Sequence, residues 1–317
     1  MEKGRTMKRV LTILCAAAMC LAVTSCAPKE EPGADAPEDI SSGTQGLDRT
    51  EDEKSSDTDK KDFSQYEIDP PYDFDPASML PREFGDYFTT DYKDCKVDTY
   101  ELAEGTDIEN EVTVLTGSEE GPTIYVVAGV HGDEQAAWLT GDLLEKISIK
   151  AGTLYILSPA NRWGAAQPVP TRYVTEEQDL NRSFPGDPDG DMAHRIADSI
   201  YRDIERIKPD FVFDLHEARI VKSGRDFLGS SLIFTSLDGM SEMFMSMIME
   251  TEMGTLCSEP FQYFSPGPAG SVNQTVTKQL GIPTVTVETF RGYPMEQRIG
   301  DQLAIVQYVM NYYGLVD

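Results

Sequence analysis

Strand-like and helix-like segments alternate along most of the chain. Short runs rich in Val, Ile, Thr and aromatic residues, such as "PTIYVVAGV" (122–130), are separated by longer segments with apolar residues at helical spacing. The last of these, at about 294–313, carries Ile299, Leu303 and Val306 on one face. Strands that alternate with helices favour a sheet covered on both faces. We therefore predict an α/β fold with a mixed, mainly parallel sheet and helices on both of its faces.

The same patterns place the individual elements. The predicted strands are 111–117, 122–130, 152–159, 210–215, 230–236 and 283–289, and the predicted helices are 134–147, 191–207, 240–251, 269–280 and 294–313. A long loop over 160–190 interrupts the alternation. No internal repeat is present.

Polar side chains follow three of the predicted strands, at the point where each strand ends. The strand 122–130 leads into His131 and Glu134. The strand 210–215 leads into His216, and the strand 283–289 carries Glu288. Ligands of open α/β sheets bind beyond the carboxyl ends of the strands. The sequence therefore predicts that these four side chains share one site.

His131, Glu134 and His216 are residue types that hold catalytic zinc, which takes three protein ligands and keeps one position open. Each histidine also has a plainer interpretation: His131 as a polar turn residue that caps the next helix, and His216 as a partly buried partner of Asp214. Asp214 shares a strand face with His216 and could orient its imidazole. The remaining histidine, His194, lies at a helical spacing that is typical of an exposed helix residue.

Four motifs in a fixed order make the pattern more specific: "HGDE" at 131–134, "DLNRSFPG" at 179–186, "DLHE" at 214–217, and the late strand glutamate. In this order, over about residues 100–317, the chain resembles the zinc-dependent M14 carboxypeptidase superfamily. It is most similar to the succinylglutamate desuccinylase and aspartoacylase branch, in which the "TRY" ahead of "DLNR" is also familiar.

This resemblance implies a zinc carboxypeptidase-like fold with one Zn²⁺ per chain, held by His131, Glu134 and His216. It implies that Glu288 is the general base, a role that suits a carboxylate beside activated water. The remaining implied residues are Asn181 and Arg182, which would grip a substrate carboxylate, and Arg172, which would polarise the scissile carbonyl.

Two of these assignments have alternatives. Arg162 lies on the same long loop as Arg172 and could polarise the carbonyl instead. Asn181 and Arg182 could merely fasten this loop to a neighbouring acidic residue.

The implied activity is hydrolysis of an amide next to a free carboxylate, as in a deacylase of N-acyl amino acids. Members of this branch have a further β-rich domain after the catalytic glutamate, whereas 29 residues follow Glu288 here. We therefore expect a more open cleft, which keeps a carboxypeptidase of peptides or cell-wall fragments as an alternative. A second alternative is a non-catalytic lipoprotein that binds carboxylates, although a binding module would be free to lose Glu288.

The N-terminus has the pattern of an exported lipoprotein. Met7, Lys8 and Arg9 precede a short apolar run, and "VTSC" at 23–26 resembles the lipobox of bacterial lipoproteins. We predict a signal peptide over 1–25, a lipidated Cys26 and a disordered acidic linker over 26–62, because this stretch has almost no large apolar side chains. An ordinary signal peptide with an incidental cysteine is the alternative.

The catalytic domain should then occupy 63–317. The lipid would anchor it to the outer face of the bacterial cell membrane or to the outer membrane, and Ala27 favours the outer membrane in a cell with two membranes. The net charge of −28 argues against a nucleic-acid partner, because phosphate binding needs Lys and Arg. Cys95 and Cys257 remain in this domain, paired or free.

Overall fold

The computed structural model describes residues 69–219, 228–235 and 241–317. The predicted signal peptide, Cys26 and the predicted linker lie outside the described residues, so these assignments stay predictions.

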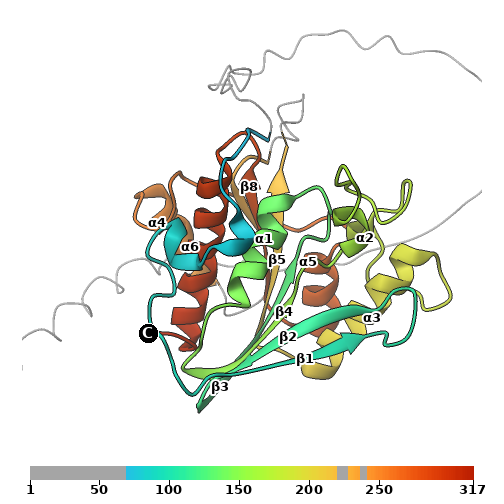
Figure 1. The fold of residues 1–317 in the computed structure, drawn as a ribbon, viewed down its shortest axis with the longest axis horizontal. Helices are drawn as coiled ribbons and strands as arrows, with labels where there is room; N and C mark the ends of the chain where they lie inside the picture. The colour runs from blue at the N-terminus through green and yellow to red at the C-terminus, as the bar shows by residue number, and fades with distance from the viewer. Residues whose placement is uncertain (1–68, 220–227, 236–240) are drawn as a thin grey trace, which may run out of the picture. The chain divides into compact units, whose positions relative to one another are not determined.

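An eight-stranded sheet with the order β1-β2-β4-β3-β5-β8-β6-β7 forms the centre of the fold (Figure 1). Its strands are β1 (Lys96–Leu102), β2 (Asn110–Thr116), β3 (Glu119–Ala128), β4 (Ala151–Leu157), β5 (Phe211–Ala218), β6 (Ser231–Phe234), β7 (Gln262–Phe264) and β8 (Thr284–Phe290). The four central strands β4, β3, β5 and β8 run parallel, as do β6 and β7, whereas β1 with β2, β2 with β4 and β6 with β8 pair antiparallel. The predicted mixed, mainly parallel sheet is confirmed.

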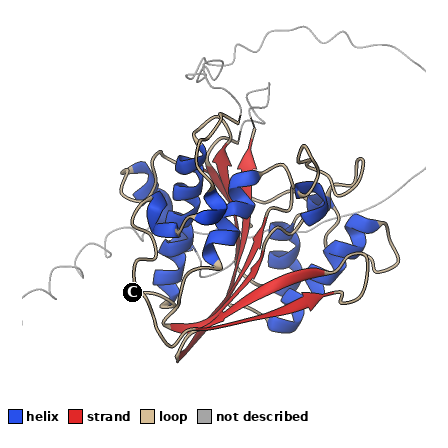
Figure 2. Cartoon of the chain, viewed as in Figure 1, coloured by secondary structure: helices blue, strands red, loops and turns tan. Residues whose placement is uncertain are grey.

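Helices cover both faces of this sheet (Figure 2). They are α1 (Gln135–Leu144), α2 (Arg162–Ala165), α3 (Met192–Ile207), α4 (Ser241–Glu252), α5 (Val272–Thr275), which continues as a π-helical turn over Val276–Leu280, and α6 (Met295–Tyr313). Short 3-10 turns cover Pro76–Ser78, Pro81–Phe84 and Leu180–Arg182. Among the described residues, no helix is long and apolar enough to cross a membrane.

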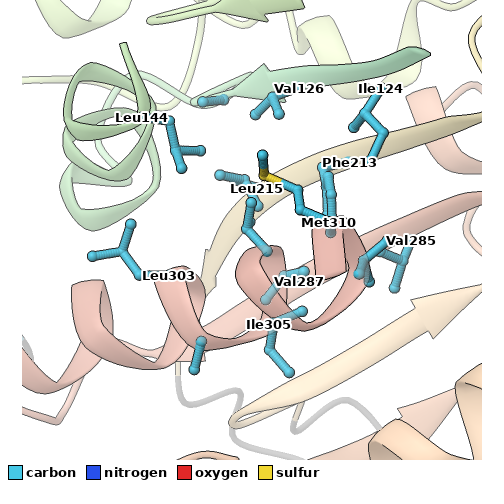
Figure 3. Packing of buried hydrophobic residues seen from close by; sticks show 14 of the residues in the cluster. Ile124, Val126, Leu144, Phe213, Leu215, Val285, Val287, Leu303, Ile305 and Met310 are labelled. Atoms are coloured by element: carbon cyan, nitrogen blue, oxygen red, sulfur yellow. The ribbon is translucent and has the colours of Figure 1, made fainter. Parts of the chain in front are cut away.

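Alternating side chains of the central strands build a separate core on each face. On β3, Ile124 and Val126 belong to the cluster formed with α1, α4 and α6, whereas Tyr125 and Val127 belong to the cluster formed with α3 and α5. Figure 3 shows the first cluster, in which Leu303 of α6 packs toward the sheet. Full burial of one such side chain is worth about 1.5–3 kcal/mol, so both layers hold the central strands firmly.

The face toward α3 and α5 changes character near the carboxyl ends of β5 and β8. On this face of β5, the apolar Val212 is followed at alternate positions by Asp214 and His216. On β8 the same face carries Thr286 and Glu288. All four polar side chains are buried. The sheet therefore places a polar site at one end of an otherwise apolar face.

Two strands, β1 and β7, were not expected from the sequence pattern. β1 is mostly exposed and lacks apolar alternation, yet every residue from Lys96 to Leu102 pairs with a residue of β2. β7 has only three residues beside β6. Both are edge strands, whose existence depends on a neighbour's free backbone groups more than on their own side chains.

Candidate functional site

His131, Glu134 and His216 meet at the carboxyl ends of β3 and β5. The Nδ1 atom of His131 lies 2.6 Å from Oε1 of Glu134, and Nδ1 of His216 lies 2.7 Å from Oε2 of the same carboxylate. The two Nδ1 atoms are 3.2 Å apart. All three side chains are buried, with 1–3% of each residue exposed. Residues 85 positions apart in the sequence thus form one compact group of donor atoms.

The second ring nitrogen of each histidine contacts a different carboxylate. Nε2 of His131 lies 3.2 Å from Asp179, and Nε2 of His216 lies 2.9 Å from Asp214. Asp214 is itself held by the Thr286 hydroxyl, which donates to its other oxygen at 2.9 Å. A histidine that donates its Nε2–H to a carboxylate keeps Nδ1 free for a metal, so these partners fix the ring orientation that a metal site requires.

The donor set fits a zinc ion. Two imidazole nitrogens and a carboxylate are the ligands of many catalytic zinc sites, and the 3.2 Å between the Nδ1 atoms is close to the roughly 3.3 Å edge expected for tetrahedral Zn–N bonds of about 2.0–2.1 Å. The electrostatics agree. Burial would lower the pKa of His216, but Asp214 and Glu134 raise it well above its usual range, so the group has a negative potential that favours a cation.

The two histidines shift the pKa of the Glu134 carboxyl in the opposite direction. Burial would raise the pKa of its carboxyl, but the His131 and His216 imidazoles hold it well below its usual range. The carboxylate also accepts a hydrogen bond from the backbone N–H of Glu217 at 3.0 Å. Glu134 is therefore ionised and fixed in place, as a metal ligand must be.

Glu288 lies beside this group on the neighbouring strand. In the parallel pairing of β5 with β8, Glu288 is the register partner of His216, and both side chains point to the same face of the sheet. Only 8% of Glu288 is exposed. Burial raises the pKa of its carboxyl to about 7, with the His216 imidazole opposing the rise and Glu134 adding to it. A carboxylate of this kind is suited to accept a proton from water.

Close backbone packing shapes the turn that carries His131. A Cβ atom on Gly132 would lie 2.3 Å from the backbone nitrogen of Ala165, so only glycine lets α2 press against this turn. Asn161, which caps α2, donates from its amide to the carbonyl oxygen of Arg172 at 3.1 Å. The long loop is thereby held against the metal ligands.

Arg172 projects from this loop toward Glu134 and Asp179. Its Nε and Nη2 donate to one oxygen of Asp179 at 3.2 and 3.1 Å, and its Nη1 lies 3.6 Å from Glu134. Burial would raise the pKa of the Asp179 carboxyl, but His131 and Arg172 hold it below its usual range. Arg162, the alternative, is exposed and stacks over Trp163 with 5.0 Å between its Cζ and the ring centroid. The structure thus brings Arg172, and not Arg162, to the candidate site.

Asn181 and Arg182 lie in the short turn after Asp179. The Asn181 amide is buried, with Nδ2 3.3 Å from Nε2 of His216 and Oδ1 accepting from the backbone N–H of Val272 at 3.1 Å. The Arg182 guanidinium donates to the Asn181 carbonyl at 2.7 Å. No carboxylate of the described residues pairs with Arg182. Its charge is available to an anion.

A cavity of about 940 Å³ connects these residues. Its lining includes the polar groups of His131, Glu134, Glu288 and the arginines. It also includes the apolar side chains of Ile233, Phe264, Pro266 and Pro268. A cavity with such a mixed lining can hold a ligand that has both polar groups and an aliphatic part.

Several supporting residues could not be identified from the sequence pattern. Asp179 links His131 to Arg172, and buried Glu217 accepts from the backbone N–H of Ala136 at 2.8 Å and from Arg298 at 2.5 Å. Asp179 is the first residue of the motif "DLNR" and Glu217 is the last residue of "DLHE", so these motifs were the available signal for the two acids. No motif indicated Arg298 on α6.

The remaining histidine and the two cysteines lie outside the site. His194 is partly exposed on α3, and its Nδ1 lies 2.8 Å from Asp191. Cys95 and Cys257 are both free thiols, the second of them buried.

Comparisons with known proteins agree with this geometry. Residues 120–312 match the family model of the succinylglutamate desuccinylase/aspartoacylase catalytic domain. A stretch of 110 residues is 36% identical to an N-alpha-acetyl-L-2,4-diaminobutyric acid deacetylase of Halomonas elongata. This stretch covers 33% of the chain and 31% of that enzyme, so the chain matches about a third of its curated relative.

Solved structures share the fold at low sequence identity. An aspartoacylase family protein from Mesorhizobium loti is similar with a TM-score of 0.53 and 22% identity, over 72% of this chain and 70% of the other. Product-bound Csd4, a cell shape determinant protein of Helicobacter pylori, has a TM-score of 0.55 and 14% identity, over 69% and 56% of the two chains. The predicted zinc carboxypeptidase-like fold and the family resemblance are confirmed.

Proposed function

The chain belongs to the succinylglutamate desuccinylase/aspartoacylase family, and from this premise we propose that it is a zinc-dependent hydrolase of an amide bond next to a free carboxylate, acting on N-acyl amino acids or related compounds. The observation that carries the proposal is the convergence of His131, Glu134 and His216 with Glu288 as the strand neighbour of His216. A bound zinc ion would lower the pKa of a water molecule to about 7 and polarise the amide carbonyl.

The protein residues then have distinct tasks. Glu288 takes the proton from the attacking water while the water oxygen bonds to the amide carbon, and it passes this proton to the nitrogen as the C–N bond breaks. Arg172, fixed by Asp179, faces the oxygen on which negative charge develops. Arg182 binds the substrate carboxylate, because its guanidinium has no acidic partner among the described residues. Asn181, which the sequence assigns to the same grip, has its amide held between His216 and the backbone N–H of Val272 in this structure.

We predict that Arg182→Ala weakens cleavage of a free-acid substrate as severely as amidation of the substrate carboxylate weakens cleavage by the wild type. Either change removes a charge-assisted contact of about 1.5–3 kcal/mol, which corresponds to a loss of roughly 10- to 150-fold in kcat/KM. Combining both changes should add little, because the two partners belong to one interaction. Steady-state kinetics on the four combinations measures this coupling.

Arg206→Ala, on the exposed side of α3, is the matched control and should leave both substrates unchanged. Equal cleavage of free-acid and amidated substrates by the wild type would show that no carboxylate is gripped.

A carboxypeptidase that acts on peptides or cell-wall fragments is the second candidate. The cavity volume of about 940 Å³ favours it, because this is near the upper end for pockets that hold small ligands. The discriminating experiment is to incubate the zinc-loaded protein with a mixed panel of N-acyl amino acids, peptides and muropeptides and to identify the products by mass spectrometry. Cleavage between an acyl group and an amino acid supports a deacylase, and release of a C-terminal residue supports a carboxypeptidase.

We also propose that the enzyme is exported and anchored through a lipid on Cys26, from the "VTSC" sequence that precedes the acidic segment. Cys26→Ala should abolish metabolic labelling with a palmitate analogue and release the protein from the membrane fraction. Cys95→Ala, a cysteine of the catalytic domain, is the control and should label normally. Unchanged labelling of the Cys26 variant would refute the anchor.

A further inference from the structure

A second basic group borders the catalytic cavity, centred on Arg291. The backbone N–H of Arg291 donates to the Ala218 carbonyl at 2.9 Å and so extends the pairing of β5 with β8 beyond Glu288. Its side chain is only 6% exposed. Nη1 donates to Asp133 at 2.9 Å, and Asp133 belongs to the same turn as His131 and Glu134. The guanidinium is therefore held rigidly beside the metal ligands.

The edge of this guanidinium formed by Nε and Nη2 holds the carboxylate of Asp69. Nε donates to one oxygen at 2.6 Å and Nη2 to the other at 2.7 Å, which is the bidentate geometry that arginine uses to bind free carboxylates. Arg298 and Arg219 flank the same carboxylate, with nitrogens 3.6 and 3.9 Å from its oxygens. A carboxylate in this position faces three arginines.

The charges around these arginines balance only with Asp69 in place. Arg298 pairs with Glu217, and Arg291 and Arg219 share the single carboxylate of Asp133. Without Asp69, the three guanidinium groups would share only the carboxylates of Glu217 and Asp133, so a net positive charge would remain for another anion to offset. Asp69 precedes residues 120–312, the segment that matches the family model.

Two adjoining cavities meet at these arginines. Asp133, Pro170, Arg219 and Arg291 line the catalytic cavity and also a neighbouring cavity of about 460 Å³, which Asp69 borders. The Asp69 side chain is 39% exposed, so it can rotate toward solvent without unfolding its surroundings. Arg291 and Arg219 are thus open to a ligand in the catalytic cavity, and Asp69 approaches them from the neighbouring cavity.

We propose that Arg291, with Arg219 beside it, is a second carboxylate-binding subsite of the catalytic cavity, and that the Asp69 carboxylate occupies it as an internal competitor. The subsite would take a carboxylate remote from the scissile amide, so the favoured substrates carry two carboxylates. The assignment of the remote carboxylate to a substrate rests on the proposed function, whereas the subsite itself does not.

The test is calorimetric titration of the full-length, zinc-loaded protein with glutarate, a five-carbon dicarboxylate. Asp69→Asn keeps the side-chain shape but removes the competing charge, so it should bind glutarate about tenfold more tightly than the wild type, because a tethered competitor acts at roughly millimolar effective concentration. Asp73→Asn, at an exposed acid of the same segment, is the matched control and should bind like the wild type.

Adding Arg219→Gln to Asp69→Asn should remove part of the gain, and adding Arg291→Gln should remove all of it. Arg219 is 59% exposed, so its variant tests the subsite even if the Arg291 variant does not fold. Equal glutarate affinity of Asp69→Asn and the wild type would overturn the proposal and make Asp69 a structural ion-pair partner only. A gain that survives both arginine substitutions would also overturn it.

A kinetic comparison separates the subsite from the proposed function. For N-acetylglutamate the KM of Asp69→Asn should fall about tenfold, whereas for N-acetylglutamine, which lacks the second carboxylate, it should stay at the wild-type value. Tighter glutarate binding without cleavage of any amide would leave the subsite intact and refute the hydrolase. Suppose instead that both proteins cleave the substrates and that the ratio of the KM for N-acetylglutamate to the KM for N-acetylglutamine is the same in Asp69→Asn and in the wild type. This result would refute the subsite and leave the hydrolase intact.

Discussion

Replacement of Glu288 by Gln is expected to leave metal binding intact and to lower kcat by about a hundred- to ten-thousandfold. The substitution preserves the size of the side chain beside His216, but an amide cannot accept the proton of the attacking water. Glu288 is not among the three residues whose donor atoms converge, so its removal leaves the ligand group complete. Metal content by elemental analysis and kcat by steady-state assay measure the two effects separately.

Glu296→Gln, at an exposed position of α6, provides the matched control and should retain both metal and rate. A near-normal rate for Glu288→Gln would mean that another group accepts the proton. Loss of the metal in this variant would instead make Glu288 a ligand.

Replacement of His131 or His216 by Ala should reduce bound zinc from about one per chain to a small fraction and abolish turnover. Each change removes an Nδ1 atom from the group around Glu134 and leaves two ligands, which hold zinc far less tightly than three. The buried carboxylates would then repel each other without a cation to offset them. Elemental analysis after gel filtration gives the zinc content of each variant.

His194→Ala is the control, because this partly exposed histidine of α3 contacts Asp191, the residue before the helix, and lies outside the site. Equal zinc content in all three variants would contradict the ligand assignment. Retained turnover in a zinc-free variant would contradict the proposed chemistry as well.

The elements that the sequence predicts best are those whose side chains are buried. The strand 122–130 is almost wholly apolar and four of the six residues of 210–215 are apolar, and the structure places the two as the central strands β3 and β5. β1 escapes prediction because it is an edge strand with exposed side chains, and only its backbone pairing with β2 defines it. Boundaries also differ, since helix 134–147 is shortened to Gln135–Leu144, with Glu134 immediately before it.

The candidate site also contains residues that the sequence predicts and residues that it does not predict. Its four central residues follow strand ends, and the rule that strand ends converge in an α/β sheet is enough to group them. The arginines could not be grouped in this way. Arg172 and Arg162 look alike in the sequence, and the choice between them depends on the fastening of Arg172 by Asn161 and Asp179. Arg291 pairs with Asp69, which is more than two hundred residues away in the sequence, and no local sequence pattern indicates such a pair.

The adjacency of β3, β5 and β8 also bears on how the protein folds. His131 and Glu288 are more than 150 residues apart in the chain, and the strands that carry them are separated in the sheet by β5 alone. Contacts of such high sequence separation form late, because the intervening chain must first lose most of its freedom. A growing polypeptide therefore lacks the complete metal site until nearly all of it has been synthesised. Zinc at the proposed site would then bind the folded chain and stabilise it by mass action.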